Sequence, residues 1–247
     1  MNQHSHHPPA DATGLYTLQV IAKAGKFNRW MYNEIKPFLK GEVLEIGSGI
    51  GNISELAVRD RLSITLSDYN ERYCEWLKNK FALSENVRDV LKIDLLHPRF
   101  TDHFLNLKER FDSIFLLNVI EHIQDDATAI RNCSYLLKPE GHLIILAPAG
   151  NWLYSKLDKE LGHVKRYRLR DLIALFEKEN YTIMKSHHFN FTGIGGWFLF
   201  GKILRRRSLG NEMSAFNSIV PAAKLVDKLI LKKAGLSVIV AGRKNKS

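Results

Sequence analysis

Three glycines at alternate positions constrain the fold of this chain more than any other feature of its sequence. An apolar run, Val43–Ile46, leads directly into Gly47, Gly49 and Gly51, and a helical pattern begins at Ile53. Glycine permits positive φ and close approach of a ligand to the main chain, and the first turn of a helix offers unpaired N–H groups. The pattern predicts a strand, a tight turn and a helix start, serving either as a plain connection or as one wall of a binding site.

The length of the chain, 247 residues, favours one large domain with appendages over two equal domains. Hydrophobic residues make up 45% and charged residues 25%, as in ordinary globular proteins. The two cysteines, Cys74 and Cys133, show neither metal-ligand nor C-x-x-C spacing. These features indicate a reducing, cytoplasmic setting without a disulfide framework, and no apolar run reaches the ~20 residues of a membrane span.

The first fourteen residues contain three histidines, His4, His6 and His7, and two prolines but no apolar core. We therefore expect residues 1–14 to be a disordered tail and not a secretory signal. The histidines of such a tail can bind metal adventitiously. Residues 15–247 are expected to form a single domain, with one or two cap helices over residues 15–39.

The net charge of +10 is concentrated near the end of the chain. Residues 197–247 hold eleven Lys and Arg against two acidic residues, a balance of +9, which leaves 25 basic and 24 acidic residues elsewhere. A nucleic-acid-binding surface spread over the whole domain is therefore not expected, and the basicity belongs to the C-terminal fifth of the chain.

Between these ends, strand and helix patterns alternate five times, which is typical of a parallel, doubly wound sheet. The run Phe111–Leu117 is nearly all apolar, as a strand covered on both faces requires. The expected strands are 43–46, 62–68, 87–93, 111–117, 142–147, 181–191 and 237–241, and the expected helices are 53–59, 70–81, 125–137 and 169–179. We predict an α/β fold with a seven-stranded, mostly parallel sheet, an antiparallel last strand and helices on both faces.

Distinctive polar residues follow the predicted strands at their carboxyl ends, where open α/β sheets bind ligands. Asp68 ends the second strand, Asp94 the third, and Asn118–His122 the fourth. A carboxylate at the second position can accept both hydroxyls of a ribose, and one at the third can accept from an adenine amino group. Tyr69 is placed to lie against the adenine ring. Asp94 alone would be equally consistent with a turn former.

The order of these motifs resembles that of the class I S-adenosylmethionine-dependent methyltransferases. The resemblance spans roughly residues 15–190 and the final strand. It rests on Glu45-Ile46-Gly47-Ser48-Gly49-Ile50-Gly51, Asp68, Ile93-Asp94-Leu95, Asn118-Val119-Ile120-Glu121-His122 and Leu137-Lys138-Pro139-Glu140-Gly141-His142-Leu143. It implies that the cofactor is S-adenosyl-L-methionine, with the glycine loop around its methionine moiety, Asp68 at the ribose, Asp94 at the adenine and the backbone near Asn118 at the amino group. The cofactor-binding residues expected on this basis are Glu45, Gly47, Ser48, Gly49, Gly51, Asn52, Asp68, Tyr69, Asp94, Leu95, Asn118 and Val119.

A nicotinamide-dependent oxidoreductase is the alternative, because Asp68 also lies about twenty residues beyond the glycines. Three features count against it: the glycines form G-x-G-x-G, Glu45 precedes them, and Asp94 has no role in a dinucleotide fingerprint.

Methyl transfer depends mainly on alignment, and an acceptor that loses a proton also needs a base. His163 and His122 follow the fifth and fourth strands, and His163 is expected to be the base or a substrate ligand, or else a structural loop residue. Arg166 and Tyr167 are candidates for orienting the acceptor, with a surface salt bridge as the alternative for Arg166. No metal-ligand spacing is found, and we predict no metal.

A basic, amphipathic insert is expected at residues 193–235. Its apolar start, Gly193–Leu204, precedes Arg205–Arg207, and Lys224, Lys228 and Lys232 recur every four residues. An apolar helical stripe is predicted at Phe216, Ile219, Val220, Ala223, Val226 and Ile230. The insert is predicted to roof the acceptor site, either as a lid packed on the domain or as an interfacial segment on anionic lipid.

The sequence thus predicts a cytoplasmic methyltransferase, with contact to the inner membrane surface as an additional expectation. The expected acceptor is a hydrophobic small molecule, a lipid or a lipid-linked sugar. Nucleic-acid binding through the basic segment is the non-enzymatic alternative, disfavoured by the apolar runs within that segment. The acceptor, the methylated atom and the oligomeric state do not follow from the sequence.

Overall fold

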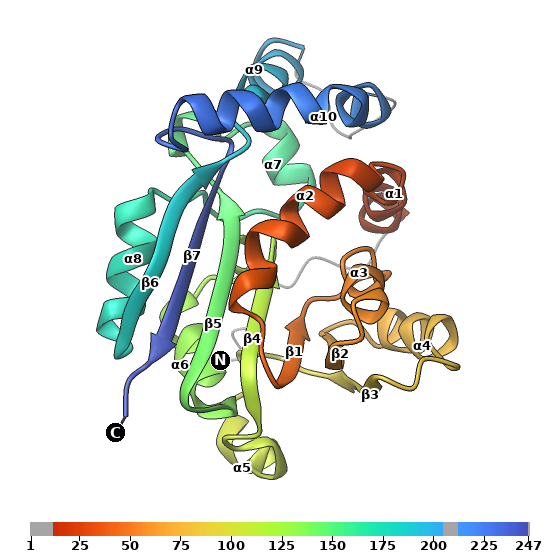
Figure 1. Ribbon diagram of the computed structural model, residues 1–247, viewed down its shortest axis with the longest axis vertical. Helices are drawn as coiled ribbons and strands as arrows, with labels where there is room; N and C mark the ends of the chain where they lie inside the picture. Colours follow the sequence, from red (N-terminus) through yellow and green to blue (C-terminus); the bar gives the residue numbers. More distant parts are fainter. Residues whose placement is uncertain (1–11, 205–211, 247) are drawn as a thin grey trace, which may run out of the picture.

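The computed structural model describes residues 12–204 and 212–246 and contains a seven-stranded sheet of order β3-β2-β1-β4-β5-β7-β6. Strands β1 to β5 are mutually parallel, and β7 runs antiparallel to both β5 and β6 (Figure 1). The strands are β1 Glu42–Ile46, β2 Ser63–Asp68, β3 Val87–Lys92, β4 Phe111–Leu117, β5 Leu137–Pro148, β6 Tyr181–Phe189 and β7 Ser237–Lys244. The predicted fold class is confirmed.

Successive residues of the central strands enter two separate cores, one on each face of the sheet. Leu44 and Ile114 pack in one core, whereas their neighbours Val43 and Phe115 pack in the other. Side chains alternate between the faces of a strand, so a strand that is covered on both faces must be apolar at every position.

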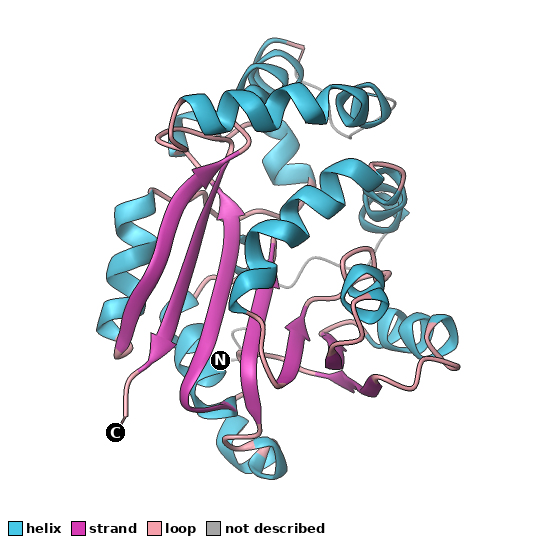
Figure 2. Ribbon diagram, viewed as in Figure 1, coloured by secondary structure: helices cyan, strands magenta, loops and turns pink. Residues whose placement is uncertain are grey.

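Helices cover both faces of the sheet (Figure 2). Helices α2, α3 and α4 contribute to the core that contains Val43, and α5, α6 and α8 contribute to the core that contains Leu44. The helices are α1 Ala12–Ala22, α2 Gly25–Ile35, α3 Ser54–Arg59, α4 Glu71–Lys80, α5 Phe100–His103, α6 Asp126–Leu136, α7 Lys156–Glu160, α8 Leu169–Lys178, α9 Thr192–Trp197 and α10 Glu212–Leu229. Among the described residues, no helix has the length and hydrophobicity needed to cross a membrane.

The element boundaries differ from the sequence predictions at several places, of which three affect longer segments. Helix α1 starts at Ala12, inside the segment predicted as a tail, whose residues 1–11 lie outside the described part of the chain. Strand β5 starts at Leu137 and includes Lys138–Gly141, which lie between the predicted helix 125–137 and the predicted strand 142–147, because Leu137 takes an extended conformation directly after α6. Strand β7 continues to Lys244, where pairing with β6 extends beyond the apolar residues on which its predicted end at residue 241 was based.

The described parts of the insert lie over the carboxyl ends of the parallel strands as α9, a π-helical segment Phe198–Ile203 and α10 (Figure 1). Helix α10 buries Val220 and Ala223, but Ile219 is 52% exposed, so the predicted stripe is wrong at that position. The buried face includes Asp227 instead, whose carboxylate accepts hydrogen bonds from the backbone N–H groups of Asn190 and Phe191. This contact ties α10 to the end of β6.

Candidate functional site

The three glycines after β1 all adopt positive φ, at +72° for Gly47, +54° for Gly49 and +79° for Gly51. A Cβ at Gly47 would lie 2.4 Å from Cγ2 of Val119, and one at Gly51 would lie 2.8 Å from the ring of Phe81. Both the backbone angle and the lack of space therefore require glycine. The loop forms a close-fitting cradle at the edge of a cavity.

Asp68, at the end of β2, holds this loop in place. Its Oδ2 accepts from the N–H of Gly49 and its Oδ1 from the N–H of Asn70, both at 2.9 Å. Burial raises the pKa of this carboxyl, which is 8% exposed and lines the cavity. A carboxylate has capacity for about four hydrogen bonds, so Asp68 can accept further donors from a ligand.

Glu45 and Asn52 also line the cavity, and their side chains connect the glycine loop to neighbouring segments. The carboxylate of Glu45 is buried and accepts from the hydroxyl of Ser54, and burial raises its pKa to about 7. The side chain of Asn52 donates to the backbone oxygen of Leu18 at 2.9 Å, which links the loop to α1.

The next strand ends bring Asp94 and Asn118 to the same cavity. The Oδ1 of Asp94 accepts from the N–H of Leu96 at 2.8 Å, the local turn that the sequence allowed, and the side chain also lines the cavity. Asn118 adopts a φ of +54°, and its N–H donates to Leu146 of β5. Ser48, Tyr69, Leu95 and Val119 are further lining residues, so all predicted cofactor-binding residues except Gly51 line this one cavity.

The cavity has a volume of about 760 Å³, within the ~300–1,000 Å³ typical of small-molecule sites. It extends from the glycine loop to the insert, whose Trp197, Phe200 and Phe216 line it together with Phe27 and Met31 of α2. The glycine cradle, the buried carboxylate of Asp68 and this volume fit an adenosyl cofactor with room for a second molecule.

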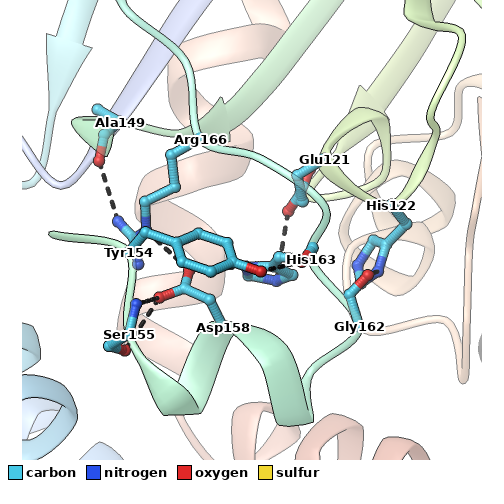
Figure 3. A network of polar contacts seen from close by, with 9 residues as sticks. All are labelled: Glu121, His122, Ala149, Tyr154, Ser155, Asp158, Gly162, His163 and Arg166. Atoms are coloured by element: carbon cyan, nitrogen blue, oxygen red, sulfur yellow. Dashed lines mark hydrogen bonds and ion pairs between the residues drawn. The ribbon is translucent and has the colours of Figure 1, made fainter. Parts of the chain in front are cut away.

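A polar cluster that lines the same cavity is centred on His163 (Figure 3). The Nδ1 of His163 lies 3.0 Å from Oδ1 of Asp158, a residue of α7. Arg166 donates from Nε to the same oxygen at 2.7 Å and from Nη1 to the backbone oxygen of Ala149 at 3.0 Å. Burial alone would raise the pKa of Asp158, but the hydrogen bond from His163 and the charge of Arg166 lower it to about 2.

Arg166 is 3% exposed, which excludes the surface salt bridge considered from the sequence. Its guanidinium lies over the ring of Trp197, 4.6 Å from the centroid, and lines the cavity. Arg166 is therefore a buried ion-pair partner of Asp158. A negatively charged group on the acceptor would have to bind Arg166 alongside Asp158.

Tyr167 does not line the cavity, and the prediction that it orients the acceptor is wrong. Its hydroxyl donates to Asp126 at 2.9 Å and lies 3.3 Å from the oxygen of Ile120, and its ring belongs to the core. The residue pairs with Ala149 in a β-bridge, and in such extended backbone adjacent side chains such as those of Arg166 and Tyr167 point to opposite sides.

His122 and Glu121 complete the cluster from the 3₁₀ turn Ile120–His122 after β4. The rings of His122 and His163 meet edge to face with centroids 4.9 Å apart, and burial lowers the pKa of His122 to about 4. The carboxylate of Glu121 is fully buried, 3.9 Å from Nε2 of His163, and burial raises its pKa to about 7.

Sequence reasoning missed Asp158 and Glu121 as site residues. Glu121 stands within the motif after the fourth strand. Its position next to His122 was the one sequence feature that could have marked it as a site residue. Asp158 lies in a segment predicted as a loop, where α7 forms with a capping box between Ser155 and Asp158. A Ser followed three residues later by an acidic residue is a recognisable helix-start pattern and could have indicated this helix.

Comparisons with known proteins identify the chain at the level of family. A family model described as a methyltransferase domain matches residues 24–186, well over half of the chain. A ubiquinone biosynthesis O-methyltransferase of Yersinia enterocolitica is 26% identical over 122 residues, 48% of each protein, and one of Proteus mirabilis is 24% identical over 102 residues, 41% of this chain and 40% of the relative. The chain thus spans less than half the length of these curated relatives.

Solved structures share the fold at low sequence identity. Phosphoethanolamine N-methyltransferase 2 of Haemonchus contortus, solved with S-adenosylhomocysteine, matches with a TM-score of 0.62 and 15% identity, covering 96% of this chain and 60% of that one. A SAM-dependent methyltransferase of Archaeoglobus fulgidus matches with a TM-score of 0.57 and 15% identity, covering 88% and 94%. The family match agrees with the expected methyltransferase family and disfavours the nicotinamide alternative, and the two solved structures show the shared fold.

Proposed function

The chain belongs to the methyltransferase-domain family, and on that premise we propose that it methylates an amphipathic small molecule, lipid or lipid-linked sugar at the end of the cavity near His163. The observation that carries this proposal is one continuous cavity whose lining includes the glycine cradle, a buried polar cluster around His163, and apolar side chains from α2 and the insert.

For the donor half, the glycine loop and the backbone at Asn118 hold the methionine moiety, Asp68 accepts from the ribose hydroxyls, and Asp94 and Leu95 meet the adenine. S-adenosylmethionine supplies an electrophilic methyl group on a sulfonium. The contribution of the chain is to hold the two reactants in line, which can lower the barrier by ~7–11 kcal/mol.

For the acceptor half, the Nε2 of His163 is the group that meets the reacting atom. Its Nδ1 is bonded to the Asp158 carboxylate, so the lone pair of the neutral ring lies on Nε2. An acceptor hydroxyl has to lose a proton, and His163 serves either as its base or as a ligand of a cation that promotes that loss. The name of the curated relatives, O-methyltransferase, supports oxygen as the methylated atom.

An apolar tail on the acceptor is supported by the walls between these two ends. Phe27, Met31, Trp197, Phe200 and Phe216 line this part of the cavity, and burying a hydrocarbon chain against them would contribute roughly 25 cal/mol per Å². In the polar cluster, by contrast, Asp158 already bonds both His163 and Arg166. The apolar walls therefore favour an acceptor with a hydrophobic part. His163 determines which functional group of the acceptor reacts.

The outer side of the insert supports contact with an anionic membrane surface. Trp152 is 61% exposed and Phe198 44%, with ring centroids 6.5 Å apart. Leu199, Ile203 and Leu204 are also exposed, and Arg205–Arg207 follow in the sequence, outside the described residues. Exposed apolar residues beside a cationic run are the features of an interfacial segment.

Calorimetric titration tests the donor half. S-adenosylhomocysteine should bind in the micromolar range, and Asp68→Ala should weaken it at least tenfold, whereas Asp89→Ala, an exposed site on β3, should not. No binding of S-adenosylhomocysteine, together with binding of a nicotinamide cofactor, would contradict the proposed function.

Vesicle co-sedimentation tests the membrane contact. Replacing Leu199 and Ile203 by Ser, or Arg205–Arg207 by Gln, should reduce binding to vesicles that contain phosphatidylglycerol. Leu83→Ser is the matched control, since Leu83 is 98% exposed on the connection between α4 and β3. Equal binding of all variants would remove this part of the proposal, and binding to nucleic acid but not to vesicles would favour the alternative.

A further inference from the structure

Glu121 is a buried carboxylate for which the structure shows no hydrogen-bond partner. Its exposed fraction is 0%, and neither Oε1 nor Oε2 accepts a hydrogen bond. An ionised carboxylate removed from water needs a compensating charge or donors, and Nε2 of His163, at 3.9 Å, is too far away for a hydrogen bond. Glu121 is one of the residues that line the cavity, and an ion bound by the two neighbouring histidines would lie next to its carboxylate.

The two histidines beside Glu121 are both oriented through their Nδ1 atoms. The Nδ1 of His122 lies 3.2 Å from the backbone oxygen of Gly162, and the Nδ1 of His163 lies 3.0 Å from Asp158. Both partners are acceptors, so each neutral ring carries its hydrogen on Nδ1 and its lone pair on Nε2. An Nδ1–H donated to a carboxylate or backbone carbonyl is the arrangement that orients metal-binding histidines.

These three side chains lie close enough together to share one ion. One ligand atom from each of Glu121, His122 and His163 lies within 4.8 Å of the other two. Bonds of about 2.0–2.2 Å hold the ligands of a bound ion roughly 3–3.5 Å apart, so small side-chain rotations bring this set to bonding distance. Two imidazoles and one carboxylate form a donor set suited to first-row divalent ions.

We propose that Glu121, His122 and His163 bind one divalent transition-metal ion, of the Zn²⁺ or Mn²⁺ kind, at the acceptor end of the cavity. The inference rests on the proposed function, because the remaining positions of the ion face the space assigned to the acceptor. It narrows the acceptor to a molecule that offers a hydroxyl to the ion. Coordination lowers the pKa of a bound hydroxyl, whose proton passes to water.

The charges around the cluster are consistent with a cation. Its buried charged groups are the carboxylates of Glu121 and Asp158 and the guanidinium of Arg166, which pairs with Asp158. One negative charge remains uncompensated among these three. A divalent ion and a deprotonated acceptor hydroxyl together bring this local sum to zero. A proton on Glu121 is the competing explanation for the unpartnered carboxylate.

Manganese is the probe that tests this site, because bound Mn²⁺ can be followed by electron paramagnetic resonance. Full-length protein is treated with chelator and titrated with Mn²⁺ and, separately, with Zn²⁺. The tail histidines can bind metal on their own, so the same titrations are repeated with His4, His6 and His7 replaced by Gln. We expect one tightly bound ion per chain in both backgrounds and, for Mn²⁺, spin-echo modulation from nitrogen ligands.

Glu121→Gln and His163→Gln should each weaken ion binding at least tenfold, whereas His103→Gln, at an exposed site on α5, should leave it unchanged. Binding of S-adenosylhomocysteine should stay within about threefold in all these variants, which also shows that they fold. If a variant does not fold, the nitrogen modulation in the chain with His4, His6 and His7 replaced by Gln decides.

Three results would overturn the inference and point to a protonated Glu121. They are the absence of ion binding, ion binding that depends on the tail histidines alone, and bound Mn²⁺ without nitrogen ligands. Each of these results leaves the proposed function intact as long as S-adenosylhomocysteine binds. Failure of that titration would contradict the proposed function whatever the metal result.

Discussion

The Nδ1 of His163 lies 3.0 Å from Oδ1 of Asp158, five residues earlier in the chain. The other oxygen of Asp158 accepts from the backbone N–H and the hydroxyl of Ser155, so the carboxylate that orients the histidine is itself fixed by the capping box of α7. This short helix and the loop after it place the imidazole at the end of the cavity.

Asp158→Asn should disturb the tautomer of His163. An Asn side chain can turn its amide donor toward the ring, which favours the lone pair on Nδ1. Nitrogen-15 NMR of the histidine rings should show the Nδ1–H form in the natural chain and a mixed population in the variant. Asp171→Asn, on the exposed side of α8, is the control. An unchanged spectrum would mean that the hydrogen bond does not select the tautomer.

Arg166→Met should lower the free energy of unfolding by about 3–5 kcal/mol, because it leaves Asp158 buried without its cation. Arg131→Met removes an ion pair with Glu179 in which the arginine is 59% exposed, and it should cost less than ~1 kcal/mol. Urea unfolding of both variants measures the difference. Equal losses would show that the burial of the Arg166 pair has no energetic consequence.

Gly47→Ala should abolish binding of S-adenosylhomocysteine, since its Cβ would meet Val119 at 2.4 Å and its φ is +72°. Gly195→Ala is the matched control. Among the described residues, no atom beyond its own helix lies within 4 Å of the position that its methyl group would take, so this variant should bind normally and gain about 0.5–1 kcal/mol of stability. Calorimetry measures the binding and urea unfolding measures the stability. Normal binding of S-adenosylhomocysteine by Gly47→Ala would contradict the proposal that the glycine loop holds the cofactor.

Glu45→Gln should stabilise the ligand-free protein more at pH 8 than at pH 5. Burial raises the folded-state pKa of Glu45 from 4.5 to about 7, so the folded state holds this proton more tightly than the unfolded state. Stability is therefore lost as the pH rises through this window, by up to ~3 kcal/mol, and Gln removes that loss. Denaturant unfolding of both proteins at pH 5 and pH 8 measures this difference in stability. A gain that is independent of pH would contradict the raised pKa.

Much of the donor side could be predicted from the sequence because its signals are local. Gly47 follows an apolar run directly, Asp68 ends an alternating strand pattern, and the carboxyl ends of parallel strands meet at one edge of the sheet. The acceptor side could not be predicted in the same way. Arg166 and Tyr167 are neighbours in the chain, yet only contacts from distant elements decide that Arg166 lines the cavity and Tyr167 packs in the core.

The sequence by itself determined the order of strands and helices and the glycine loop, since these depend on periodicity and on residues adjacent to strand ends. The order of its motifs also carries the family resemblance that implies the cofactor. The tertiary structure decided which side chains meet. Glu121 and His163 are forty-two positions apart, and only the packing of the loop after β5 against the turn after β4 brings them within 3.9 Å. A buried carboxylate beside two histidines is a property of that contact, so no local pattern could reveal it.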